Sequence, residues 1–135
     1  MRMLTFHVAG VVALLALTAA SAPKEVDISK LPPAADKNGL TYVADIKPTF
    51  QKACFEYHGP KKQKANLRLD SLAAALRGSD NGPVIVPGDS AKSKLVHNIA
   101  RIGDEDDYMP PPGKGDQLTK GQIGLIRAWI DQGAK

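Results

Sequence analysis

Apolar residues recur at helical spacing in four stretches of this 135-residue chain. The four expected helices begin at about Asp45, Ser71, Asp89 and Thr119. The best candidate for a β-strand is residues 84–86, but Pro83 and Pro87 enclose it, so an extended loop is expected there. The pattern therefore predicts an all-α fold.

Capping and stop signals support these helices. The expected N-terminal caps are Asp45, Asp70, Asp89 or Ser90, and Thr119. The first helix is expected to run through residues 54–58 and to stop at Gly59, which Pro60 follows. Thr119 and Gln122 match a capping box. The apolar face that follows this box consists of Ile123, Ile126, Trp129 and Ile130.

The connections between the expected helices are long for so small a domain. They cover residues 60–70, 78–88 and 103–118. Long irregular segments inside a compact domain need a surface to pack on. A buried cofactor would supply such a surface, so the loop lengths favour a prosthetic group without identifying it.

The N-terminal region has the order of a secretory signal peptide. Basic Arg2 precedes an apolar run over residues 8–17, and small residues follow it. We expect cleavage after Ala20, a polar linker over residues 21–40 and one domain over residues 41–135. The predicted location is the periplasm or outside the cell, and a membrane tether is expected only through an uncleaved leader.

The composition narrows the function classes. The formal net charge is +4 and aromatic residues make up 5% of the chain, too few to indicate stacking on nucleic-acid bases. No nucleophile with a neighbouring base and no catalytic acid–base pair is visible, so no enzymatic activity is expected. The chain has a single cysteine, which is unusual in an exported protein. Its thiol must be free, joined to another chain, or bonded to something other than sulfur.

The sequence CFEYH at residues 54–58 differs at one position from the c-type haem attachment motif C-x-x-C-H. In that motif two thiols bond to the haem and the histidine ligates the iron. Cys54 would be the covalent anchor and His58 the proximal ligand, while Tyr57 stands in the place of the second thiol. Met109, in a proline-rich loop, is the candidate distal ligand, and His97 ranks below it.

Several further stretches, in this order and spacing, make residues 46–135 resemble the planctomycete-type cytochrome c domain. They are HGP (58–60), KQK (62–64), LRLDS (67–71), GPVIVPG (82–88), SKL (93–95), MPP (109–111) and residues 125–134. The resemblance implies a small helical cytochrome c fold that binds haem c, with His58 as the proximal and Met109 as the distal ligand. It also implies redox partner proteins.

Tyr57 leaves three explanations open. Either one thioether through Cys54 suffices to attach haem, or haem is absent, or the tyrosine is a sequence error or an isolated variant. Three functions follow from the residues: a haem-binding electron carrier, a haem-free binding or interaction module with the same fold, and a copper or other soft-metal site. Cys54, His58 and Met109 would be the ligands in the last case.

Overall fold

A computed structural model describes residues 24–135. Every secondary-structure element in this part of the chain is a helix or a helical turn. The α-helices are α1 (Lys47–Ala53), α2 (Leu72–Arg77), α3 (Lys94–Ile99) and α4 (Lys120–Asp131). Short helical turns, η1 to η5, occupy Ile28–Lys30, Tyr42–Ile46, Lys64–Asn66, Ser90–Lys92 and Glu105–Asp107. The predicted all-α class is confirmed, and the predicted leader lies outside the described residues. No helix in the described part is long and apolar enough to cross a membrane.

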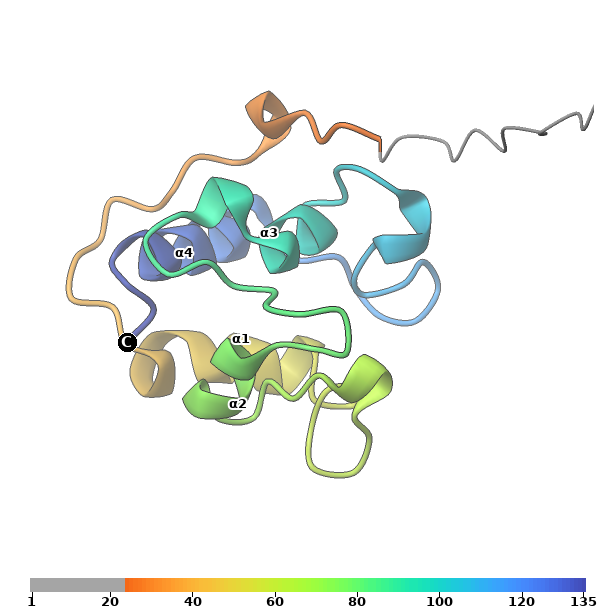
Figure 1. The fold of residues 1–135 in the computed structure, drawn as a ribbon. Coiled ribbons are helices and arrows are strands. Elements are labelled where there is room, and N and C mark those ends of the chain that lie inside the picture. Colours follow the sequence, from red (N-terminus) through yellow and green to blue (C-terminus); the bar gives the residue numbers. More distant parts are fainter. Residues whose placement is uncertain (1–23) are drawn as a thin grey trace, which may run out of the picture.

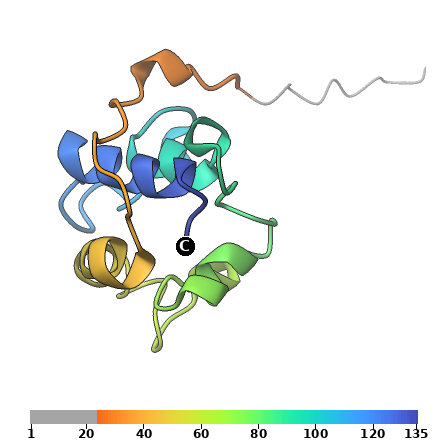
Figure 2. The same cartoon turned by 90° about the vertical axis from the view of Figure 1, so that its left-hand side faces the viewer.

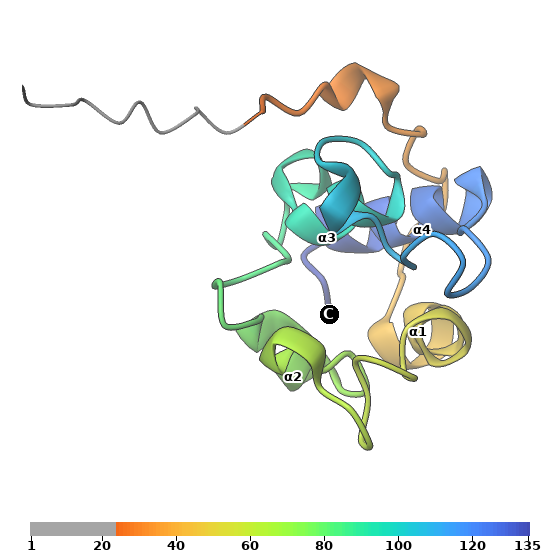
Figure 3. The same ribbon diagram turned by 90° about the vertical axis from the view of Figure 1, so that its right-hand side faces the viewer.

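The helices form two groups around one core. Helices α1 and α2 lie on one side of the molecule and α3 and α4 on the other (Figures 1 and 3). Trp129 of α4 is fully buried where the groups meet, and its ring centroid lies 6.2 Å from that of Tyr42 and 6.3 Å from that of Phe50. This aromatic cluster joins the C-terminal helix to the segment that leads into α1.

Helix α4 has the cap and the buried face that its sequence predicts. The Gln122 amide donates to the Thr119 hydroxyl at 3.1 Å, and the Thr119 amide donates to the Gln122 side chain at 2.9 Å. Each bond satisfies a polar group at the start of the helix or its cap. The buried residues of α4 include Ile123, Ile126, Trp129 and Ile130, as expected.

The first predicted helix is shorter at its C-terminal end than the sequence indicated. Helix α1 ends at Ala53, and residues 54–57 continue as turns. Cys54 leaves the helical conformation at φ −127°, and both its amide and that of Phe55 donate to the Phe50 carbonyl. A Cβ on Gly59 would lie 2.3 Å from the Phe55 carbonyl oxygen, so this turn requires glycine there.

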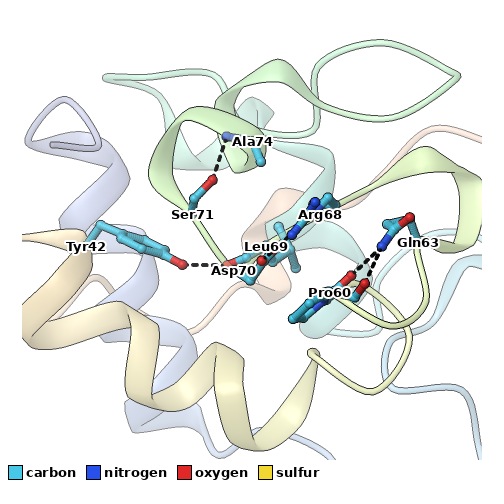
Figure 4. A network of polar contacts seen from close by, with 9 residues as sticks. Tyr42, Pro60, Gln63, Arg68, Leu69, Asp70, Ser71 and Ala74 are labelled. Atoms are coloured by element: carbon cyan, nitrogen blue, oxygen red, sulfur yellow. Dashed lines mark hydrogen bonds and ion pairs between the residues drawn. The ribbon is translucent and has the colours of Figure 1, made fainter.

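The caps of the first two helices also differ from the predicted ones. Thr41 caps the turn that precedes α1, and the Asp45 carboxylate accepts from the Thr41 amide. Ser71 caps α2. Asp70 is instead bound by Arg68, whose guanidinium donates to both carboxylate oxygens at 2.6 and 2.9 Å (Figure 4). Asp89 caps η4, the turn before α3, as one of the two predicted candidates.

Part of the segment predicted as a linker packs on α4. It crosses that helix in Figure 2. The Ala35 amide donates to the Gly124 carbonyl at 2.9 Å, and a Cβ on Gly124 would lie 2.6 Å from the Pro33 carbonyl oxygen. Arg127 donates to the Pro32 carbonyl, and the Gln132 side chain makes hydrogen bonds to the backbone further along the segment. Residues before 41 thus contact α4 through their backbone.

Candidate functional site

Two adjoining cavities lie where the CFEYH segment faces α3 and the Met109 loop. The larger measures about 370 Å³ and the smaller about 130 Å³. Both are lined by the same four residues: Cys54, His58, Ile99 and Met109. The fold therefore brings together the three residues that the sequence singled out, from positions up to 55 apart (109 − 54).

The backbone around His58 is fixed on both sides of the residue. Its amide donates to the Cys54 carbonyl at 2.9 Å, and its carbonyl accepts from the Leu69 amide at 2.8 Å. The Leu69 carbonyl in turn accepts from the Tyr42 hydroxyl at 2.6 Å, which connects His58 to the aromatic core (Figure 4). After His58, the Gln63 side chain closes the turn by donating to the Gly59 and Pro60 carbonyls.

The His58 imidazole is buried and uncommitted. The residue is 9% exposed, and Nδ1 is buried without a hydrogen-bond partner among residues 24–135. Burial lowers the pKa of His58, and the backbone at Leu67 and Lys64 only partly opposes this effect. A neutral imidazole is the form that ligates a metal. A buried polar atom without a partner calls for an explanation, and a ligand bound to this ring would provide one.

Cys54 is half-buried and its sulfur is not in a disulfide. Burial raises the pKa of the thiol to about 12, from an ordinary value of 9.0. The thiolate is the reactive form of cysteine, so in the folded chain this thiol is nearly inert at neutral pH.

We expect iodoacetamide to alkylate Cys54 of the folded, haem-free protein at least about a hundredfold more slowly than in the unfolded chain, because so little thiolate is present. Mass spectrometry over time at mildly alkaline pH, with and without urea, measures both rates. As Cys54 is the chain's only cysteine, no second thiol complicates the comparison. Equal rates in the two conditions would show that the thiol is not shielded by the fold.

Met109 is a partly buried residue that packs against the hydrophobic core. Its amide donates to the Asn98 carbonyl at the end of α3, at 3.0 Å. His97, the alternative distal ligand, lines neither cavity, and its Nε2 lies 2.6 Å from the Ala91 carbonyl oxygen. Of the two candidates, the structure thus places only Met109 beside His58.

Tyr57 lines the larger cavity, in the position that the second thiol would occupy. The ammonium groups of Lys62 and Lys64 lie 5.4 and 5.9 Å from the centroid of its ring, within the range of cation–π attraction. Lys114 also lines this cavity. None of these lysines was a predicted site residue; Lys62 and Lys64 belong to the KQK stretch beside the motif, and Lys114 lies outside it.

Besides the four shared residues, each cavity is lined by residues of its own. The larger has Tyr57, the three lysines, Pro110 and Pro111 on its wall, while Leu67, Leu69, Val84 and Leu95 give the smaller one an apolar part. Three lysines therefore line the larger cavity, while the apolar part of the smaller one lies beside polar residues that include Lys94 and Asp107.

The sequence of this segment matches a known family. Residues 54–113 match the family model of Planctomycete cytochrome C. The match is consistent with a planctomycete-type cytochrome c domain, as the resemblance predicted, and it begins at Cys54 and includes His58 and Met109. No curated protein and no solved structure matches the chain.

The residues of this cytochrome c segment fit a haem group with one covalent bond in place of two. His58 offers an unpartnered neutral imidazole, Met109 a thioether and Cys54 one thiol, and all three line the same cavities. Among residues 24–135, no group of three or more His, Cys, Asp or Glu side chains could hold a metal ion. A bare metal ion here would need a ligand of another type beside Cys54 and His58, and the sulfur of Met109 is one candidate.

Proposed function

We propose that this protein is an exported c-type cytochrome domain that holds haem between His58 and Met109 and carries electrons. The observation that carries the proposal is that both candidate axial ligands and the candidate anchor line both adjoining cavities. The bound haem would supply a reversible one-electron change at iron.

The chain's residues would have separate roles in this function. His58 would provide the proximal nitrogen, held in place by its two backbone bonds. Met109 would provide the distal sulfur, and His/Met ligation favours a high reduction potential, suited to electron transfer. Cys54 would tether one edge of the macrocycle. Ile99 and the apolar wall of the smaller cavity would exclude water from the iron, which also raises the potential.

The substitution Tyr57→Cys tests whether the missing thiol is the only defect of the motif. We expect it to raise the fraction of haem-loaded protein, since it completes C-x-x-C-H, when the protein is exported alongside the cytochrome maturation machinery. The loaded fraction is measured from the ratio of Soret to protein absorbance. The pyridine haemochrome should move to the position of a haem with two thioethers.

Tyr57→Ser is the matched control, because serine has nearly the shape of cysteine and lacks the thiol. It removes the ring beneath Lys62 and Lys64 in the same way, so a difference between the two variants reports the sulfur. If neither variant nor the wild type carries haem, the cavities do not bind this group. A colourless protein with a titratable thiol then favours the haem-free module, and a copper-dependent absorbance favours the soft-metal site.

A further inference from the structure

Two hydrogen bonds attach the loop that carries Met109 to the C-terminal end of α3. The Met109 amide donates to the Asn98 carbonyl at 3.0 Å. One residue further, the Pro110 carbonyl accepts from Nη2 of Arg101 at 2.8 Å. Because Ile99 of the same turn lines both cavities, this end of α3 is both a wall of the site and the anchor of the candidate ligand loop.

Arg101 stands at a position where a helix end favours glycine. The Ile102 amide donates to the His97 carbonyl and the Arg101 amide to that of Asn98, the hydrogen bonds of a Schellman motif. The residue after the cap of that motif adopts a left-handed conformation, and Arg101 has φ +55°. For a residue with a Cβ this conformation carries strain that glycine avoids.

The guanidinium of Arg101 carries a second cost. Its Nε atom is buried and has no hydrogen-bond partner in the part of the chain that the structure describes. Such atoms are rare in folded proteins and call for an explanation. The left-handed backbone and the unpaired Nε therefore both disfavour arginine at this position. The contact that favours arginine is the bond from Nη2 to the Pro110 carbonyl.

We propose that Arg101 is a positioning residue that fixes the Met109 loop so that the sulfur stays beside His58. This inference rests on the proposed function, because it assigns Met109 the distal position. Without the guanidinium, the Asn98 carbonyl is the remaining hydrogen-bond contact between α3 and residues 109–110. The loop would then move away from the site more often, and the sulfur would leave the iron.

The substitution Arg101→Gly separates positioning from stability, because glycine suits the left-handed backbone while removing the side chain. In haem-loaded protein we expect the Soret band to persist, since His58 and Cys54 are unchanged. The weak near-red band of methionine-ligated ferric haem should disappear, and the reduction potential should fall, because the thioether ligand that favours a high potential is lost. Arg101→Lys keeps a cationic donor and should restore part of the band. Arg77→Ala, which removes an exposed arginine of α2, should change neither signal.

Hydrogen exchange in the haem-free protein tests the clamp without the cofactor. Arg101→Gly should speed the exchange of the Met109 amide by about tenfold, as expected for the loss of one charged hydrogen bond. The amides of α4 should be unaffected, and the urea midpoint should stay the same or rise. Wild-type protein that takes up no haem would contradict the proposed function, and the exchange data would still decide on the clamp. Unchanged Met109 exchange in Arg101→Gly would overturn the role of Arg101, as would an unchanged near-red band.

Discussion

Replacing His58 with alanine is expected to abolish the low-spin haem spectrum completely. The substitution removes the imidazole that we place on the iron, and no other histidine lines either cavity. Any haem still tethered through Cys54 should be high-spin, with a shifted Soret band. The free energy of unfolding of the haem-free protein should stay within about 1 kcal/mol of the wild-type value, because Nδ1 of this ring has no hydrogen-bond partner among the described residues.

His97→Ala is the matched control for this experiment. His97 is the other histidine of the described chain, and its ring lies against the Ala91 carbonyl, outside the cavities. It should leave the low-spin spectrum and the near-red band unchanged. If His97→Ala removed the low-spin signal while His58→Ala kept it, the two histidines would have the reverse of the roles assigned here.

Replacing Trp129 with alanine is expected to cost about 3–5 kcal/mol of unfolding free energy. The side chain is fully buried between Tyr42 and Phe50, and its indole N–H donates to the Lys135 carbonyl at 3.0 Å. A domain of this size has a stability of only about 5–15 kcal/mol. Urea unfolding followed by circular dichroism measures the change.

Trp129→Phe is the control that keeps an aromatic ring in the core. It should cost clearly less than the alanine variant, because most of the buried apolar surface remains and only the indole hydrogen bond and part of the volume are lost. Equal costs for both variants would mean that packing against Tyr42 and Phe50 does not stabilise the fold in the way described.

The helical class and the terminal helix could be predicted because their signals are local. The Thr119–Gln122 capping box and the apolar spacing after it are contained within a few turns of chain. The end of α1 could not be predicted, because it depends on the contact between Gly59 and the Phe55 carbonyl. The docking of the residues before 41 likewise depends on Gly124, which lies 91 residues after Pro33 (124 − 33) and lets the backbone of Pro33 approach α4.

The residues of the candidate site that belong to a sequence motif could be predicted. Those whose role depends on tertiary contacts could not. The spacing of Cys54 and His58 by itself indicates a haem attachment motif. The sequence already ranked Met109 above His97, but only the fold shows that His97 is engaged with the Ala91 carbonyl and lines neither cavity. Arg101 gave no signal in the sequence, since an arginine after a short helix is ordinary until its left-handed backbone and its bond to Pro110 are seen.

The central claim is that one cysteine and one histidine hold haem in this fold. Mass spectrometry of the exported protein, combined with its visible spectrum, tests this most directly. The account predicts a protein heavier by one haem, with the added mass on the peptide that contains Cys54 and with sharp bands on reduction. Colourless protein of unmodified mass, obtained with the maturation machinery present and a correctly matured cytochrome c beside it, would contradict the account.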